Sequence, residues 1–288
     1  MKRELIIPLV GLMFLSFTKD KTAYRIYNSE GKDVSYSKML TSLNEADIIL
    51  FGEHHDNPIS HWLERELTGD LFTNSPDGMV LGAEMFEADN QLLLDEYLGG
   101  LITEAKFEEE ARLWKNYKTD YKPLLKFALD HKILFVATNV PRRYANLVHR
   151  EGFEGLENLS SEAKKFLPPL PLQYDPELPW YKELLEMDHG GGVEVNERFP
   201  QSQAIKDATM GYFILQNWSQ GKQFLHFNGA GHSDNYGGIV WYLQQEQPGL
   251  KIITITTVIQ EGTEELSEAS AGKADFIIVV PERMTKTY

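Results

Sequence analysis

The chain has 288 residues, of which 42% are hydrophobic and 25% charged, a composition typical of a large globular protein and not of a disordered or fibrous one. Its formal net charge of −15 argues against nucleic-acid binding, because phosphate backbones require clustered lysine and arginine. The chain has no cysteine, which excludes disulfides, thiolate metal ligands and a lipidated cysteine, so any bound metal must be held by nitrogen and oxygen.

Residues 1–21 have the form of a secretory signal. Lys2 and Arg3 precede an apolar run that is too short to span a membrane. The cleavage pattern of small residues is missing, and a buried N-terminal strand or helix is the alternative. We expect a signal peptide at 1–21 and export to the periplasm or outer cell surface, with no membrane span in residues 22–288.

Apolar, β-branched segments then alternate with helical patterns, which is typical of an α/β fold with a mostly parallel sheet and helices on both faces. The expected strands are 46–52, 78–86, 132–139, 222–231, 250–259 and 274–281. The expected helices are 58–73, 87–98, 121–131, 141–150, 200–219 and 237–246. We expect one α/β domain over residues 22–288.

A segment at about 151–200 interrupts this alternation. It holds six of the 13 prolines of the chain, with short helical patches between them. The pattern predicts a helical insertion that forms a cap in the C-terminal half. A plain surface excursion is an equally good interpretation.

Four of the expected strands end in polar residues of chemically active types. Ligands of parallel sheets bind at the carboxyl ends of the strands, where loops and helix N-termini converge. We therefore expect these residues to form one site. They are Glu53, His54, His55 and Asp56 after the first strand, Glu84 in the second, Asn139 and Arg142 after the third, and His232 and Asp234 after the fourth.

The central residues of this site follow from strand geometry and from the cost of burying charge. Successive residues of an extended segment point to opposite sides, so Glu53 and His55 can face one cavity while His54 supports them from elsewhere. Glu84 is flanked by apolar residues and requires a cation, a proton or a metal to be buried. Arg142 is the protein cation expected to pair with it if no metal is present.

Glu53, His55, Glu84 and His232 are the resulting candidates for catalysis and metal binding. Two imidazoles and two carboxylates suit Zn, Mn, Co or Fe with an open position for water, whose pKa the ion would lower. His55 could instead act without metal, as a general base held by Glu84 or Asp56. A purely structural polar network is the third interpretation.

The expected helix at 200–219 offers two supporting residues. Gln203 and Asp207 are four positions apart and share a helix face. A helix passing beside the site could present both as hydrogen-bonding partners of the central residues. Gln203 could equally face the core or the solvent.

Several segments in the same order resemble the ChaN-like haem-binding uptake proteins. This family belongs to a superfamily with the Tiki proteases, TraB-like proteins and erythromycin esterases. The segments are FGEHHDN at 51–57, GAEMFEADNQ at 82–91, Trp114 through YKPLLKFA to ATNVPRR at 137–143, QAIKDATM at 203–210 and GAGHSDNYGGI at 229–239.

The resemblance implies an α/β sandwich with a helical insertion, found in exported bacterial proteins. ChaN-like members bind haem in iron uptake, as dimers and through tyrosine, so haem binding is implied at family level and no haem ligand is assigned. Tiki-like relatives are metal-dependent proteases built on two Gly-x-x-His motifs and glutamate. These motifs read Gly52 to His55 and Gly229 to His232 here, with Glu53 and Glu84 available.

We expect a ChaN-like protein that binds haem or iron, functions in their uptake and retains a metal or hydrolase-like site at the strand ends. The alternatives are a metal-dependent hydrolase, either a Tiki-like peptidase or an esterase, and a non-catalytic scaffold. The expected partners are haem, a small-molecule or peptide substrate and a second copy of the chain.

Overall fold

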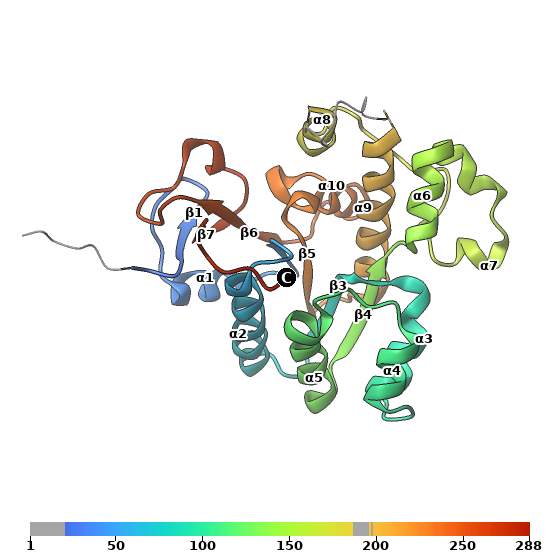
Figure 1. The fold of residues 1–288 in the computed structure, drawn as a ribbon, viewed down its shortest axis with the longest axis horizontal. Helices are drawn as coiled ribbons and strands as arrows, with labels where there is room; N and C mark the ends of the chain where they lie inside the picture. Colours follow the sequence, from blue (N-terminus) through green and yellow to red (C-terminus); the bar gives the residue numbers. More distant parts are fainter. Residues whose placement is uncertain (1–20, 187–195, 197) are drawn as a thin grey trace, which may run out of the picture.

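A computed structural model describes residues 21–186, 196 and 198–288, which contain a seven-stranded sheet (Figure 1). The order of its strands is β1-β7-β6-β2-β5-β3-β4, with β1 antiparallel to β7 and all other neighbours parallel. The strands are β1 (Arg25–Asn28), β2 (Ile48–Glu53), β3 (Met79–Glu87), β4 (Leu134–Asn139), β5 (Gln223–Gly229), β6 (Ile252–Gln260) and β7 (Phe276–Pro281). The expected signal peptide lies almost entirely outside the described residues.

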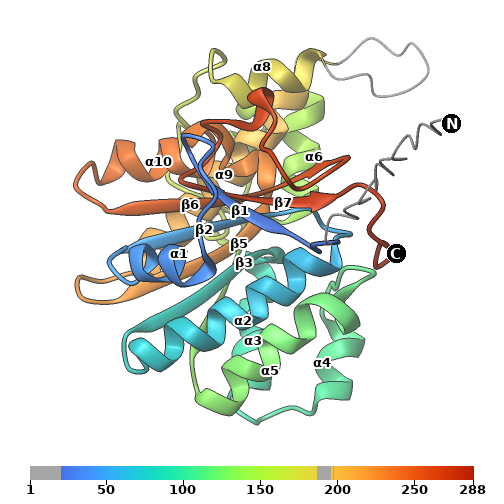
Figure 2. The ribbon, with the colours of Figure 1, turned by 90° about the vertical axis from the view of Figure 1, so that its left-hand side faces the viewer.

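Helices cover both faces of the sheet. Figure 2 shows α1, α2, α3 and α5 on one face and α6, α9 and α10 on the other. The helices are α1 (Tyr36–Leu43), α2 (Pro58–Asn74), α3 (Gln91–Leu98), α4 (Glu104–Glu110), α5 (Lys122–His131), α6 (Arg142–Glu151), α7 (Ser161–Lys164), α8 (Pro179–Glu186), α9 (Arg198–Asn217) and α10 (Ile239–Glu246).

Each central strand is apolar on both sides because it contributes to two cores. In β2, Phe51 packs in the core beneath α2 and α5, whereas its neighbour Leu50 packs in the core beneath α9 and α10. In β5, Phe227 and Phe224 divide in the same way. This arrangement explains the near-continuous apolar runs of the sequence.

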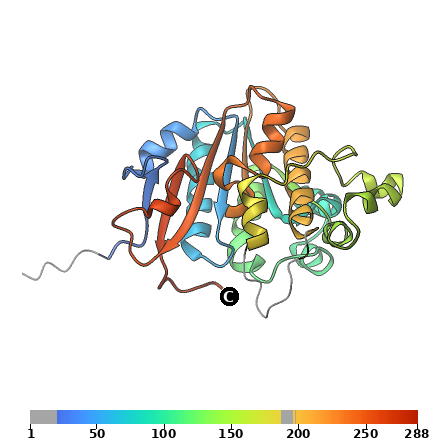
Figure 3. The same cartoon turned by 90° about the horizontal axis from the view of Figure 1, so that it is seen from above.

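The six expected strands and six expected helices are confirmed, with ends shifted by a few residues. The sequence analysis missed β1, α1 and α4, which are short elements that bury few side chains. The region at 151–200 is a helical insertion containing α7, α8 and a 3₁₀ segment at Phe153–Asn158. In Figure 3 the yellow-green ribbon of its first part lies at the right of the view, and the blue N-terminal elements lie at the left. Residues 187–195 and 197 lie outside the described part.

Among the described residues, no helix has both the length and the apolar character needed to cross a membrane.

Candidate functional site

The central strands β2, β5 and β3 are neighbours, so their carboxyl ends form one edge of the sheet. Glu53 is the last residue of β2, Glu84 lies within β3, and His232 ends the 3₁₀ turn after β5. All three side chains are buried, whereas the side chain of His55 is 32% exposed. The topology places these four residues at the same edge of the sheet.

The first imidazole is held by a carboxylate from its own strand end. Nδ1 of His55 donates to Oε1 of Glu53 across 2.6 Å, and the hydroxyl of Tyr121 donates to the same oxygen across 2.7 Å. The ring of His55 also lies edge-on to Trp114, with 4.7 Å between the ring centroids. Glu53 therefore orients His55 and leaves its Nε2 for a ligand.

The second imidazole is held by a carboxylate from a distant helix. Nδ1 of His232 donates to Oδ1 of Asp207 on α9, and the hydroxyl of Tyr181 on α8 donates to Oδ2 of the same carboxylate across 2.8 Å. Asp207 thus has the supporting position expected for it. The segment at 151–200 contributes Tyr181 to this network, and the hydrogen bond from Tyr181 to Asp207 was not predicted from the sequence.

Glu84 lies between the two imidazoles. Its Oε1 is 3.3 Å from Nε2 of His232, and its Oε2 accepts the backbone N–H of Gly229 across 2.8 Å. A Cβ atom built on Gly229 would lie 2.9 Å from Nε2 of His55 and 3.5 Å from Oε2 of Glu84, so all three groups crowd around this glycine. Absence of a side chain at Gly229 is what permits this approach.

A β-bulge in β3 turns Glu84 towards this edge. Pairing of β3 with β5 ends at Ala83, and the register with β4 shifts between Ala83 and Glu87. A bulge changes the direction in which neighbouring side chains point. Glu84 pairs with His232, whereas Glu87 pairs with Arg142.

Charge pairing outweighs burial at the buried pair. Burial alone would lower the pKa of His232, but Glu84 and Asp207 raise it to about 10. Burial likewise opposes ionisation of Glu84, yet the charge and hydrogen bond of His232, with the charge of His55, hold its pKa well below the ordinary value. The pair is therefore an imidazolium between carboxylates near neutral pH.

The pKa of His55 is raised as well. Burial lowers it, whereas the hydrogen bond to Glu53 and the charge of Glu84 raise it. His55 remains the more accessible imidazole of the two.

Two expected contacts are wrong. Arg142 does not pair with Glu84: its backbone N–H donates to Glu87 across 3.2 Å and its guanidinium is ion-paired with the same carboxylate. Asp56 does not hold His55, because Lys286 from the C-terminal segment pairs with it at 2.5 Å. The carboxylate that holds His55, as expected for a general base without metal, is that of Glu53.

The remaining supporting residues lie around the network without joining its centre. His54 is half-buried, and burial lowers its pKa. Asn139 is buried with Oδ1 lacking a hydrogen-bond partner, and Gln203 is half-buried on α9. Asp234 lies 3.8 Å from Lys273, and burial raises its pKa to about 6 despite that lysine.

His61 is a site residue that the sequence analysis left without a role. Its Nδ1 lies 3.1 Å from Oε2 of Glu53 and 3.2 Å from Oε2 of Glu64, and its Nε2 faces the carbonyl of His55 across 3.1 Å. Glu64 is fully buried. The sequence contains one indication of this role. His61, Glu64 and Thr68 are three and four positions apart and therefore share one face of α2, next to its apolar face.

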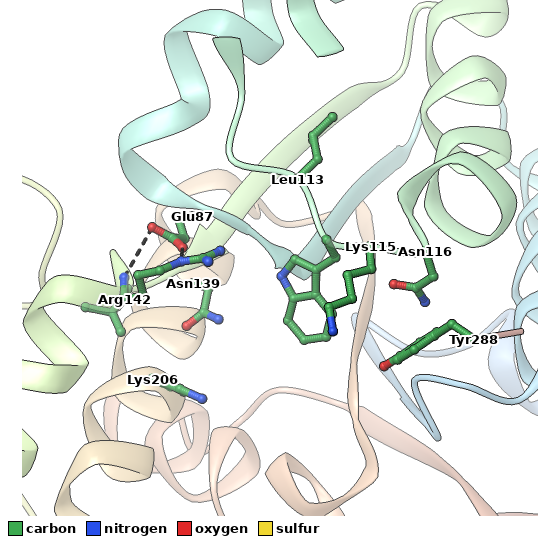
Figure 4. Close-up of a pocket in the computed structure, with 10 residues that line it drawn as sticks. Glu87, Leu113, Lys115, Asn116, Asn139, Arg142, Lys206 and Tyr288 are labelled. Carbon is green, nitrogen blue, oxygen red and sulfur yellow. Dashed lines mark hydrogen bonds and ion pairs between the residues drawn. The ribbon is translucent and has the colours of Figure 1, made fainter. Parts of the chain in front are cut away.

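A cavity of about 430 Å³ is lined in part by Trp114, whose ring contacts that of His55. Figure 4 shows eight of its lining residues with labels. Figure 4 shows Arg142 and Lys206 on one side and Tyr288 on the other. The volume is that of a small-molecule site. Its lining also includes Lys115, so three cationic side chains surround a partly aromatic hollow.

The closest group of side chains able to bind a metal differs from the four residues expected from the sequence. Within the described ranges, one group of three such residues has its ligand atoms all within 4.8 Å, namely Glu53, His61 and Glu64. It shares only Glu53 with the expected ligand set. His55 is instead paired with Glu53, and Glu84 is paired with His232.

Comparisons with known proteins bear on the family. A profile described as haem-binding uptake, Tiki superfamily, ChaN matches residues 39–243, and no curated protein sequence matches. A structure of cofacial haem binding to ChaN of Campylobacter jejuni has a TM-score of 0.68 and 17% identity, covering 89% of this chain and 96% of that one. A protein from Bacillus cereus has a TM-score of 0.50 and 12% identity, with coverages of 85% and 90%.

At these identities the solved structures show the fold alone, and the profile shows the family. Its match covers more than half of the chain and includes the strand ends and the helix that build the site. The chain belongs to the ChaN family of haem-binding uptake proteins, within the Tiki superfamily.

Proposed function

We propose that this protein binds haem in the cavity beside His55 and acts in haem or iron uptake. The observation that carries the proposal is a cavity of about 430 Å³ in a chain of this family, lined by two aromatic residues, three cations and one carboxylate. Haem is a flat, apolar molecule with two carboxylates, and this lining offers complementary surfaces.

The residues fit haem in both of its chemical requirements. Trp114 supplies an apolar face, while Lys115 and Lys206 can receive the carboxylates. Arg142 is already paired with Glu87. Haem iron takes histidine or tyrosine as an axial ligand. Tyr288 lines the cavity, and the partly exposed His55 adjoins it through Trp114, so these two residues are the candidate donors.

A haem titration followed at the Soret band tests the proposal. We expect a saturable spectral shift in the unaltered protein, and a changed band position in Tyr288→Phe or His55→Ala if that residue binds iron. Lys206→Met should weaken affinity by about tenfold, as the loss of one charge-assisted contact predicts. Lys222→Met, a change at an exposed lysine outside the cavity, is the matched control. Absence of a saturable shift would contradict haem binding.

A hydrolase is a second candidate, favoured by the two carboxylate-oriented imidazoles on either side of Glu84. His55 would accept a proton from water, and His232 would donate one to the leaving group. If an ion joins this site, His55, His232 and Glu84 would hold it, and it would supply an activated water molecule.

Peptide and ester hydrolysis, measured with and without added Mn or Zn, tests this candidate. An active protein should lose activity in His55→Ala and in His232→Asn. An inert protein under every metal condition would contradict the hydrolase. Loss of stability in these variants without any activity to lose would instead favour a structural network.

The proposal extends to the processing, the localisation and the oligomeric state of the protein. We propose removal of residues 1–21, export to the periplasm or outer cell surface, and a homodimer of the domain formed by residues 22–288. Support comes from the signal-like N-terminal sequence and from the family. Mass spectrometry of the exported protein and light scattering test the processing and the dimer.

A further inference from the structure

Glu53, His61 and Glu64 form a compact trio beneath the site. Nδ1 of His61 lies 3.1 Å from Oε2 of Glu53 and 3.2 Å from Oε2 of Glu64. The side chain of His61 is 5% exposed and those of both glutamates are fully buried. The trio therefore lies behind His55 and outside the cavity.

Both carboxylates of the trio carry an unpartnered oxygen. Oε2 of Glu53 and Oε1 of Glu64 are buried and have no hydrogen-bond partner. Oε2 of Glu53 is close enough to His61 for an ion pair, but the two groups are not aligned as a hydrogen bond. Buried unsatisfied oxygens are rare and costly, so either a proton shared between Glu53 and Glu64 or a bound cation must satisfy them.

The surroundings of the trio are those of a coordination site. Metal-binding histidines usually donate their second N–H to a carbonyl or a carboxylate, and Nε2 of His61 lies 3.1 Å from the carbonyl of His55 and 3.4 Å from Oδ2 of Asp120. Metal-binding carboxylates are usually hydrogen-bonded on their outer side. Oε1 of Glu53 accepts from His55 and from Tyr121.

Glu53, Glu64 and Asp120 place three carboxylates around one buried imidazole. Buried carboxylates require paired cations, metal ions or protons. No arginine or lysine is ion-paired with these three carboxylates in the described part of the chain. Burial lowers the pKa of His61, but Glu53 and Glu64 raise it to about 11, and burial with the charge of Glu53 raises the pKa of Glu64 well above its ordinary value. Protons on His61 and Glu64 therefore balance the charge when no ion is bound, and a divalent cation can replace them.

We propose that Glu53, His61 and Glu64 bind a divalent transition-metal ion such as Mn²⁺, Fe²⁺ or Zn²⁺. Ligand atoms at about 2.0–2.2 Å from an ion lie roughly 3 Å apart, the spacing observed here. One imidazole and two carboxylates suit these borderline ions. Glu53 would bind the ion through its Oε2 while its Oε1 keeps the hydrogen bond from His55. The ion would therefore fix the orientation of His55.

The test is elemental analysis of full-length protein refolded from denaturant and chelator in the presence of Mn²⁺ or Zn²⁺. Refolding admits the ion to a buried site. We expect about one ion per chain in the unaltered protein, and at least a tenfold lower affinity in Glu64→Gln. Glu66→Gln, an exposed glutamate of the same helix, is the matched control and should retain the ion. No bound ion, or equal binding by both variants, overturns the proposal.

A measurement on the unaltered protein keeps the proposal testable if Glu64→Gln does not fold. Pulsed electron paramagnetic resonance of the Mn²⁺ form counts coordinated imidazoles. We expect one, from His61. Two imidazoles would place the ion at His55 and His232 and overturn the proposal. Haem titration of protein refolded without added metal separates this proposal from the proposed haem binding. Haem binding can fail while the ion binds, or the reverse.

Discussion

Two histidines of the β5 region, His226 and His232, are both buried, but their pKa values are shifted in opposite directions. His226 lies in the middle of β5, with Nε2 2.7 Å from the hydroxyl of Thr138 and Nδ1 3.1 Å from Oδ1 of Asn228. Burial lowers its pKa to about 4, although Asn228 opposes that shift. The pKa of His232 is raised to about 10, because its partners are Glu84 and Asp207.

The difference teaches that the charge of the partners, and not burial, decides the state of a buried imidazole here. His226 has neutral partners because it lies where helices and strands pack on both sides. His232 lies six residues later, beyond the strand end, where a bulge and a helix bring carboxylates together. Position relative to the strand end therefore separates a histidine with neutral partners from one held by carboxylates.

Replacing His232 gives the largest effect expected from this comparison. His232→Ala leaves Glu84 and Asp207 buried without their cation, which should lower the free energy of unfolding by about 3–5 kcal/mol at neutral pH. His226→Ala leaves only neutral groups unpaired and should cost about 2 kcal/mol. Urea unfolding measures both. Equal losses, or a greater loss at His226, would contradict the assignment.

Acid should reveal the neutral state of His226. Its folded pKa lies below the unfolded value, so the unfolded chain takes up the proton first. The stability it contributes is therefore present above about pH 6.5 and is lost as the pH falls towards 4. Between neutral pH and about pH 4.5, the unaltered protein should lose about 2 kcal/mol more than His226→Gln. Parallel pH profiles of the two proteins would disprove this account.

The fold was largely predictable because each central strand is apolar on both faces and each long helix has clear ends. The four-residue edge strand β1 and the short helix α4, which buries only Phe107, carry too little pattern to be recognised. The insertion was recognisable from its prolines, but its contribution of Tyr181 to the site was not, because that contact spans 26 positions.

The site was predictable as far as strand ends determine it. Glu53, Glu84 and His232 meet because their strands are neighbours in the sheet. The pairing of Arg142 with Glu87 instead of Glu84 follows from a register shift that apolar periodicity does not reveal. His61 was missed because its position depends on the rotation of α2 about its own axis.

Neutralising one partner of His232 should move its pKa without removing the imidazole. Asp207→Asn preserves the shape of the side chain and removes one of the two charges. The pKa of His232 should then fall by about 1–2 units from its raised value, equivalent to about 1.4–2.7 kcal/mol. An NMR titration of the imidazole Cε1–H measures it, with the resonance of His226 as the internal control. An unchanged titration of His232 would show that Glu84 alone sets its charge.

The smallest effect concerns the more exposed imidazole, His55. A methyl group at Gly229 would lie 2.9 Å from Nε2 of His55, and the backbone there, at a φ of −58°, accepts alanine. Since His55 is partly exposed and can move, Gly229→Ala should cost less than about 1 kcal/mol of stability. It should shift the NMR resonance of His55 and reduce ligand affinity, while His232 is unaffected. Gly249→Ala, which adds a methyl group into open space, is the control. A shift at His232 as large as that at His55 would mean that the two imidazoles move as one unit, and that the distinction between an adaptable and a fixed histidine does not hold.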